Sequence, residues 1–221
     1  MELAGFLRSI GLDFVPIRTN VMASIGPMAT RAWSRAQHGA IYASAGHALG
    51  ARVDRVFIAS THQVGHLQPW GSHPLIDPYL SSGYVRIIHD NFRLDRSQMT
   101  VLVGDWPEAM DVLNVCVGAS DERRDKGCGE CEKCVRTAAT LVAAGRAEVA
   151  EKWRGSPLTV DTILSVRVIR PGTAQFWSRI AGEFQTRGFT KLAEAAKSVV
   201  NRYRRRALVS RAAGFFRRSV G

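Results

Sequence analysis

The chain has 221 residues, of which 46% are hydrophobic and 22% charged, and its formal net charge is +11. This composition is typical of a globular protein that can bury a core, and it excludes wholesale disorder. No apolar run approaches the roughly 20 residues that a membrane-spanning helix needs, and the first residues lack the pattern of a secretory signal. We therefore expect a cytoplasmic protein.

The first third of the chain alternates between helical and strand patterns. Apolar residues at helical spacing predict a helix over residues 3–10, and residues 12–17 read as an edge strand that contains Pro16. Residues 20–34 are irregular. Residues 35–49 predict a helix rich in Ala and Gly, and we expect it to be buried on more than one side because small side chains permit close packing.

Two short apolar runs then indicate a parallel sheet. Residues 55–59 lack clean alternation, which is typical of a strand buried on both faces, and residues 84–89 predict a second strand. Between them lies a long loop, residues 61–82, rich in His, Pro and Gly. Helices that alternate with such strands favour an α/β fold of the doubly wound class.

The rest of the chain is mostly helical in pattern. Residues 96–112 predict a helix in pieces, split near Gly104 and Pro107, and residues 113–117 a strand that leads to the first cysteine. A helix follows the cysteines and ends at Gly145. Residues 158–170 are ambiguous between helix and strand, and Pro171 and Gly172 predict a turn. Two amphipathic helices are expected at 173–187 and 189–206.

Four cysteines lie close together in the middle of the chain. Cys116, Cys128, Cys131 and Cys134 have the spacing C-x11-C-x2-C-x2-C. Two residues between cysteines allow the backbone to turn and present both thiolates to one ion, and four thiolates suit tetrahedral Zn²⁺. Gly127 and Gly129 flank Cys128 and supply the positive φ that such a turn requires.

The cysteine pattern has alternative explanations. Two disulfides conflict with a reducing compartment, whereas an iron–sulfur cluster stays open because four thiolates also bind iron and sulfide. A closed set of four cysteines matches structural zinc best, and it leaves no open position for catalysis. We therefore predict a structural zinc site, a zinc knuckle over residues 114–137.

The residues around these cysteines resemble a known family. The carrying segments are 114–116 (Asn-Val-Cys) and 128–137 (Cys-Gly-Glu-Cys-Glu-Lys-Cys-Val-Arg-Thr), with weaker support from 16–20, 38–40, 59–62 and 69–78. They resemble the 7-cyano-7-deazaguanine synthase-like branch of the PP-loop ATP pyrophosphatases, over roughly residues 3–150. The resemblance implies a Rossmann-like sheet of the adenine nucleotide alpha-hydrolase type. It also implies an ATP- and Mg²⁺-dependent ligase that adenylates a small carboxylic acid, releases pyrophosphate and forms an amide or nitrile.

The chain departs from this family at one motif. Relatives hold pyrophosphate with a Ser-Gly-Gly-x-Asp-Ser loop whose backbone amides cradle phosphate, and this sequence lacks it. Residues 44–47 and 118–121 are the nearest strings, and neither has the glycine pair. We expect the chain to correspond to the C-terminal two-thirds of a relative. Three explanations stay open: a shortened chain, a loop supplied by a partner chain, or lost ATP chemistry.

The loop 61–82 supplies most of the candidate ligand-binding residues. In open α/β sheets, ligands bind beyond the carboxyl ends of the strands, and Thr61 follows such an end. Trp70 could stack on a base, Ser72 and His73 could contact a phosphate or an acid, and Asp77 could orient a nucleophile or Mg²⁺. The alternative is a surface loop packed by its own Trp and Pro residues.

Three further candidates come from other segments. The resemblance places His38 and Asn20 near a ligand, whereas the residues alone favour a packing histidine and a turn residue. Arg136 could contact a substrate carboxylate, or simply balance the charge of the thiolates together with Lys133.

The C-terminal segment carries most of the positive charge. Residues 187–221 contain ten Lys or Arg and one acidic residue, which leaves only +2 for residues 1–186. The basic tail at 202–218 could be a solvated helix, an RNA-binding strip or a segment on an anionic membrane. We divide the chain into 1–150, a helical extension 151–206 and a tail 207–221. Rival functions are a zinc-knuckle nucleic-acid binder and a non-catalytic partner subunit.

Overall fold

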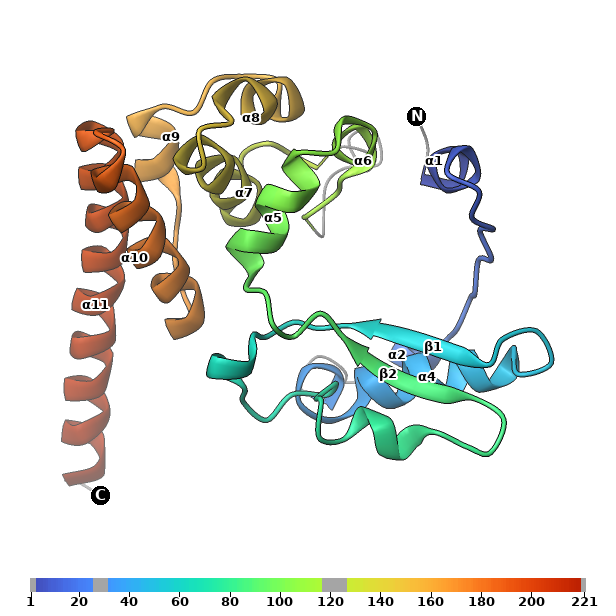
Figure 1. Ribbon diagram of the computed structural model, residues 1–221. Coiled ribbons are helices and arrows are strands. Elements are labelled where there is room, and N and C mark those ends of the chain that lie inside the picture. Colours follow the sequence, from blue (N-terminus) through green and yellow to red (C-terminus); the bar gives the residue numbers. More distant parts are fainter. Residues whose placement is uncertain (1–2, 26–31, 117–126, 220–221) are drawn as a thin grey trace. The chain divides into compact units, whose positions relative to one another are not determined.

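The computed structural model describes residues 3–25, 32–116 and 127–219, with side chains to Ser210 and excluding those of Met22 and Ile25. The chain divides into two compact units. Residues 14–99 form what we call the sheet unit, and residues 1–13 with 100–221 form the helical unit (Figure 1). These boundaries differ from the ranges 1–150, 151–206 and 207–221 taken from the sequence, which stay a prediction.

The sheet unit is built on two parallel strands. The strands β1 (Arg55–Ala59) and β2 (Arg86–Asp90) pair in register from Arg55 with Arg86 to Ala59 with Asp90. The helix α4 (His38–Ala48) lies against one face of this pair (Figure 1). Its remaining elements are α2 (Val21–Ile25), the π-helical turn η2 (Trp33–Gln37) and the 3-10 turns η3 (Val64–His66) and η4 (Asp77–Leu80).

Small residues bring α4 close to the sheet. Gly39, Ala43 and Gly46 are buried and spaced four and three residues apart, which places them on one face of the helix. A Cβ atom at Gly46 would lie 2.4 Å from Cγ2 of Val56, so only glycine permits this approach. Buried His38 lies about 100° around the helix from Gly39, so burial is not confined to this face, whereas Ala40, Ser44 and Ala48 are exposed.

Two strand predictions in this region need correction. Residues 12–17 form no strand and pair with none in the described part of the chain, and Phe14 and Ile17 are exposed. Pro16 lacks the N–H group that a sheet ladder requires, which weakens this segment as a strand. The strand at 55–59 is confirmed but is not buried on both faces, because the side chain of Phe57 is 61% exposed.

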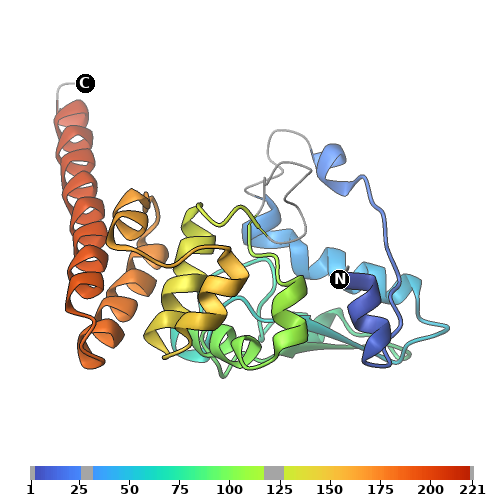
Figure 2. The same cartoon turned by 90° about the horizontal axis from the view of Figure 1, so that it is seen from above.

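The helical unit contains the larger core. Its helices are α1 (Leu3–Ser9), α5 (Arg96–Gly104), α6 (Pro107–Val112), α7 (Glu132–Ala143), α8 (Ala147–Arg154), α9 (Val160–Ser165), α10 (Pro171–Thr186) and α11 (Thr190–Ser219). Helix α5 begins just before the boundary between the units. Fully buried Leu141, Ile163, Trp177 and Phe184 form the centre of the core. The hairpin of α10 and α11 turns at Gly188, whose φ is +79° (Figure 2).

The helical unit confirms most of the sequence pattern and corrects four points. Residues 96–112 form two helices that divide where Gly104 and Pro107 were expected to split them. Residues 113–116 form no strand, and Val117 lies outside the described residues. Pro171 opens α10 instead of making a turn, because proline is tolerated in the first helical turn. Helix α8 was missed, and α11 extends to Ser219.

The observed class is mixed α/β. The part of the chain that the structure describes is mostly helical, with one two-stranded parallel sheet. The predicted α/β class is confirmed at this level.

Candidate metal centre

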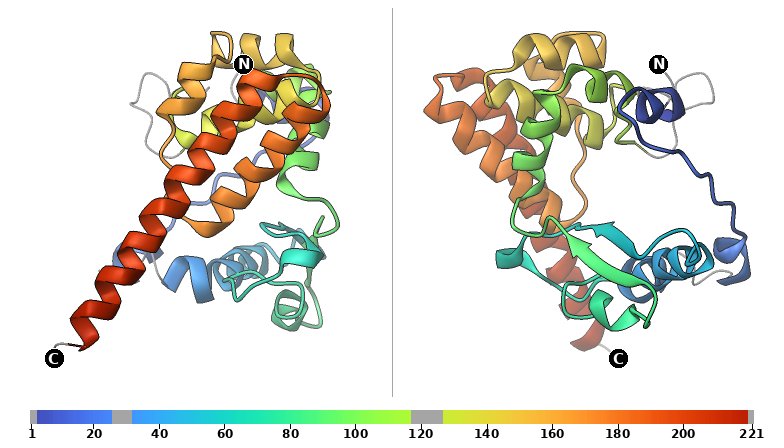
Figure 3. Two further views of the ribbon diagram at one scale, coloured as in Figure 1. Left: turned by 90° about the vertical axis from the view of Figure 1, so that its left-hand side faces the viewer. Right: turned by 45° about the vertical axis from the view of Figure 1, so that its right-hand side comes forward.

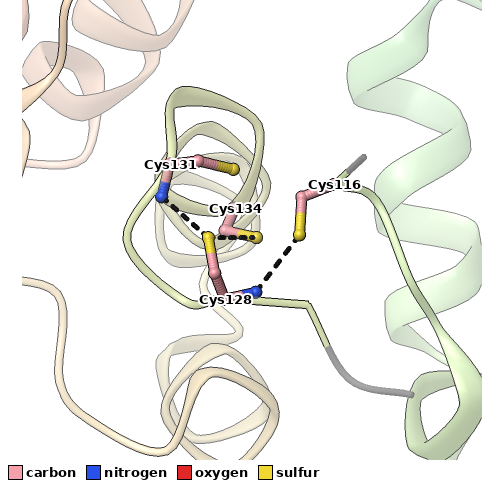
Figure 4. A group of neighbouring side chains, drawn as sticks. All are labelled: Cys116, Cys128, Cys131 and Cys134. Carbon is pink, nitrogen blue, oxygen red and sulfur yellow. Dashed lines mark hydrogen bonds between the residues drawn. The ribbon is translucent and has the colours of Figure 1, made fainter. Parts of the chain in front are cut away.

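The four cysteines come from three local structures that converge in the helical unit. Cys116 lies in the segment that follows α6, and Cys128 lies in the turn before α7. Cys131 is the N-cap residue of α7, and Cys134 lies in its first turn. Figure 4 shows the four side chains pointing toward a common centre.

The spacing of the sulfur atoms fits one metal ion. All four Sγ atoms lie within 4.8 Å of one another, and those of Cys128 and Cys134 are 4.0 Å apart. A tetrahedral site with Zn–S bonds of about 2.3 Å places its sulfur atoms about 3.8 Å apart, close to this arrangement. All four cysteines are free thiols, so the predicted preference for metal over disulfides agrees with the geometry.

Backbone amides prepare the site for anionic sulfur. The N–H of Cys128 donates to Sγ of Cys116, and the N–H of Cys131 donates to Sγ of Cys128, each over 3.2 Å. Partial burial opposes ionisation of Cys128, but the N–H groups of Glu130 and Cys131 and the neighbouring thiols lower its pKa to about 7. The start of α7 adds a positive helix end.

The pKa values of Cys131 and Cys134 show why the four thiolates need a bound cation. Burial raises the pKa of Cys134, and the neighbouring Cys131 and Cys128 raise it further. Burial also raises the pKa of Cys131. Thiols packed this closely resist ionising together, because each thiolate repels the next. A bound divalent cation removes that repulsion, so the donor set fits a metal ion.

The two glycines meet the predicted backbone requirement. Gly127 and Gly129 have φ angles of +75° and +73°, in the left-handed region that favours glycine. Gly127 has a second constraint, because a Cβ atom there would lie 3.1 Å from Sγ of Cys134. A side chain at this position would crowd the sulfur cluster as well as strain the turn.

Hydrogen bonds join the cysteine segment to two surrounding helices. In α8, Nε1 of Trp153 donates to the carbonyl of Leu113 at 3.0 Å, and Nε of Arg154 donates to the carbonyl of Gly129 at 2.8 Å. In α10, Nε1 of Trp177 donates to Oε1 of Glu132 at 3.1 Å. The metal site therefore lies at the junction of the unit's helices, as a structural site would.

Arg136 is already engaged within the helical unit. Its Nε donates to Oε1 of Glu132 at 2.8 Å, and its guanidinium lies 4.8 Å from the ring centroid of Phe176. These partners hold the side chain on α7 beside α10. A contact with a substrate carboxylate stays a prediction.

Three of the other candidates line a cavity in the sheet unit. His38, Thr61 and Trp70 border a space of about 540 Å³ that runs along β1. Trp33 and Tyr42 also line it, although sequence reasoning did not select them. Their spacing of nine residues spans a π-helical turn, which ordinary helical periodicity does not anticipate.

Ser72 and Asp77 instead form a buried cluster with His89. Asp77 is fully buried, and its Oδ2 accepts a hydrogen bond from Ser72 Oγ at 2.6 Å and pairs with His89 Nδ1 at 2.7 Å. The N–H of His73 donates to its other oxygen at 3.0 Å. This cluster fastens the loop to β2. His89 was missed, although its place two residues after Ile87 puts it on the covered face.

The remaining two candidates lie apart from the cavity lining. The side chain of His73 accepts a hydrogen bond from the N–H of Leu75 at 3.1 Å, within its own loop. Asn20 is exposed, and its carbonyl accepts from the N–H of Ser24 at 3.0 Å, which starts α2. The structure therefore groups His38, Thr61 and Trp70 in one place, and Ser72 and Asp77 in another.

Comparisons with known proteins give no relative. No protein-family model matches the chain, and neither a curated protein nor a solved structure does. Among the described residues, no helix is long and apolar enough to cross a membrane.

Proposed function

We propose that this protein is a non-catalytic relative of the PP-loop ATP pyrophosphatases. A bound zinc ion stabilises its fold, and its sheet unit binds a nucleoside or nucleotide. The observation that carries the zinc assignment is the convergence of four free cysteine sulfurs within 4.8 Å. Four thiolates complete a tetrahedral shell, so the ion stabilises the fold and takes no part in chemistry.

The nucleotide assignment rests on the cavity beside β1. Its volume of about 540 Å³ lies within the roughly 300–1,000 Å³ of small-molecule sites, and Trp33, Tyr42 and Trp70 give it aromatic walls. Aromatic rings favour flat bases, on which they stack. Thr61 supplies a hydroxyl at the carboxyl end of β1, where ligands bind in open α/β sheets. The parallel pair β1–β2 is the part of a Rossmann-like sheet that this proposal requires.

The proposal excludes pyrophosphate release by the chain alone. The sequence lacks the Ser-Gly-Gly-x-Asp-Ser loop, and Asp77 and Ser72 are buried in hydrogen bonds to each other. No group near the cavity is therefore assigned to hold the β- and γ-phosphates. We expect adenosine, AMP and ATP to bind with similar affinity.

Two measurements test this proposal. Elemental analysis of freshly purified protein should give one zinc ion per chain. Iron with acid-labile sulfide, or no metal with four reactive thiols, would refute the zinc assignment.

Calorimetry with AMP and ATP should give similar dissociation constants, and Trp70→Ala should weaken the binding of both nucleotides. The matched control is Tyr84→Ala, since Tyr84 is 87% exposed and lies outside the cavity lining.

A second candidate function is that of a partner subunit. Within the described residues β1 pairs with β2 alone, and Phe57 on the same strand is 61% exposed. An open strand edge beside an exposed aromatic side chain favours addition of a strand from another chain, which could carry the missing phosphate loop. Phe57→Lys should then abolish pyrophosphate release by the mixed subunits, and because Phe57 also borders the cavity, the loss of subunit association is measured directly by co-purification.

A further inference from the structure

The strand β1 has one open edge, and this edge borders the cavity. Four consecutive residues of β1, 56–59, line the cavity. Successive side chains of a strand point to opposite faces, so a space that touches four residues in a row lies along the strand's edge. Within the described residues β1 pairs only with β2, so the edge that faces the cavity has no partner strand.

The hydrogen bonds to β2 show which backbone groups of β1 face the open edge. The carbonyl of Asp54 and the N–H of Ser60, which flank β1, bond to β2 over 2.8 Å and 2.9 Å. In a strand the N–H and C=O groups of every second residue point to the same edge. The even-numbered residues therefore face β2, and the N–H and C=O groups of Phe57 and Ala59 face the cavity.

A second segment of the chain lacks a partner as well. Residues 14–18, which we call the edge segment, form neither helix nor strand, and every side chain at 11–20 is exposed. Phe14, Val15 and Ile17 are 40%, 54% and 53% exposed. Aromatic and β-branched residues are enriched in strands, where a neighbouring surface covers them. The edge segment has the composition of a strand but no surface that covers it.

Pro16 decides which side of the edge segment can pair. Proline has no N–H group, so in a sheet its backbone must point away from the neighbouring strand, which is possible in an edge strand. The adjacent Val15 and Ile17 then point their N–H and C=O groups toward that strand. The missing N–H also weakens the new outer edge as a template for a further strand.

The order of the elements along the chain favours a parallel pair. The edge segment precedes α4, and β1 follows α4. A strand, a covering helix and a second strand in this order form a parallel crossover, whose connection needs about a dozen residues or more. Helix α4 already lies against one face of β1 (Figure 3). We therefore expect the edge segment to lie beside β1 in the same direction.

One register satisfies both the backbone and the side chains. Pro16 then lies opposite Phe57 of β1. Val15 and Ile17 join the face that α4 covers, where Ile58 is buried. A shift of one residue would point the proline backbone toward β1 and turn every side chain to the other face. A shift of two residues in either direction would put a polar side chain in the covered row.

Charge complementarity supports the same register. Arg18 lies opposite Ala59, which pairs on its other side with Asp90 of β2. Neighbouring strands are about 4.8 Å apart, so the long side chain of Arg18 can reach the carboxylate across the small side chain of Ala59. Opposite charges in one row of a sheet favour the alignment that brings them together.

We infer that the edge segment docks on the open edge of β1 as a third parallel strand and closes the cavity. The N–H of Phe57 then donates to the carbonyl of Val15, and the N–H of Ala59 donates to the carbonyl of Ile17. The side chains of Val15 and Ile17 enter the cavity beside its aromatic walls. Since the segment belongs to the same chain, it meets β1 at a high effective concentration, and a partner's strand would have to displace it.

The consequence for ligands rests on the function proposed above. A nucleotide occupies the space that the docked side chains fill, so the docked strand and the bound nucleotide exclude each other. The apparent dissociation constant rises by the factor that the docked state takes from the open one. The same factor slows hydrogen exchange at the edge of β1, and the two measurements should therefore agree.

The first test is hydrogen exchange, followed by NMR, of the intact, zinc-loaded protein without nucleotide. The amides of Phe57 and Ala59 should exchange on the order of tenfold more slowly in the wild type than in Ile17→Pro, which removes an N–H that points toward β1. Phe14→Pro is the matched control, because a proline at the first position of the strand points away from β1. Both side chains are exposed in the structure, so neither substitution disturbs the remaining fold.

Three results of this experiment would overturn the inference. The wild type exchanges at Phe57 and Ala59 as fast as Ile17→Pro, or both proline variants lose protection equally. Protection that depends on protein concentration would show that the strand comes from a second copy.

Calorimetry with AMP is the second test. Ile17→Pro should bind AMP on the order of tenfold more tightly than the wild type, because the competing strand is lost. Equal affinities together with a protected edge would show that the docked strand leaves the cavity open, against the inference. If AMP binds neither protein, the proposed nucleotide function fails, and hydrogen exchange still decides whether the strand docks.

Discussion

The indole N–H of Trp177 donates a hydrogen bond to Oε1 of Glu132 over 3.1 Å and thereby joins α10 to the first turn of α7. Glu132 stands between Cys131 and Cys134, so this bond ties the core to the metal ligands. The same carboxylate oxygen accepts from Arg136. The position of the last two cysteines therefore depends on packing in the core as well as on the metal.

Trp177→Phe should reduce the free energy of unfolding. The change removes the indole N–H and leaves a space in a fully buried position, which together cost about 2 kcal/mol. Chemical denaturation of the zinc-loaded protein measures the difference. Trp106→Phe is the control, because Trp106 is 43% exposed and should change stability by less than about 0.5 kcal/mol. Equal effects at the two positions would contradict the proposed link.

Removal of the metal should destabilise the helical unit. An ion that binds only the folded state contributes about 4 kcal/mol when its free concentration is a thousandfold above the dissociation constant. A chelator should therefore lower the melting temperature of the wild type. Cys134→Ser should melt at the lower temperature from the start and should not respond to the chelator. A chelator effect that persists in Cys134→Ser would place the metal elsewhere.

Gly127→Ala and Gly155→Ala separate backbone strain from crowding at the sulfurs. Both glycines have positive φ, +75° and +83°, so each substitution strains the backbone by about 1–2 kcal/mol. A Cβ atom at Gly127 lies 3.1 Å from Sγ of Cys134, whereas nothing lies within 4 Å of one at Gly155. Only Gly127→Ala should weaken zinc binding, on the order of tenfold, in competition with a chelating dye. Similar affinities in both variants would show that strain alone matters.

The sequence predicted local features of the metal centre well. The short gaps between Cys128, Cys131 and Cys134 and the flanking glycines specify a knuckle without reference to distant residues, and the structure brings the four sulfurs together. The partners Trp153 and Trp177 could not be predicted, because their hydrogen bonds join residues 40 and 45 positions apart.

The sheet unit shows where local pattern fails. Residues 12–17 have the composition of a strand, but a strand also needs a partner edge, which composition does not report. Among the candidates in the loop 61–82, Thr61 and Trp70 do line the cavity. Ser72 and Asp77 do not line it, because they form the buried cluster with His89. Sequence periodicity cannot tell a cavity residue from a residue of the buried cluster, because that depends on which loop side chains contact His89 of β2.

Asp77→Asn should destabilise the sheet unit. The carboxylate has three hydrogen-bond partners, Ser72 Oγ, His89 Nδ1 and the N–H of His73. In the asparagine variant, an N–H₂ group in place of Oδ2 would face Ser72 Oγ and His89 Nδ1, and it cannot accept their hydrogen bonds. A buried donor that loses its acceptor in this way costs about 1–3 kcal/mol of stability. Asp54→Asn is the control, because that side chain is 83% exposed and its ion pair with Arg55 contributes little. Hydrogen exchange at β2 measures the effect, and equal protection in both variants would contradict it.

The pKa of Cys128 predicts a pH-dependent pattern of alkylation in metal-free protein. Hydrogen bonds from the N–H groups of Glu130 and Cys131 outweigh partial burial and lower this pKa to about 7, whereas burial raises that of Cys134. Since only the thiolate reacts, iodoacetamide should modify Cys128 faster as the pH rises through about 7, and should modify Cys134 slowly throughout.

Mass spectrometry of peptides from a time course gives the rate at each cysteine. In urea the backbone hydrogen bonds are lost, so all four cysteines should react alike, with midpoints near the ordinary value of about 8.5. Zinc should protect all four in the folded protein, because coordination occupies each sulfur. If Cys128 and Cys134 react at the same rate in folded, metal-free protein, the amide hydrogen bonds do not form the anionic site described here.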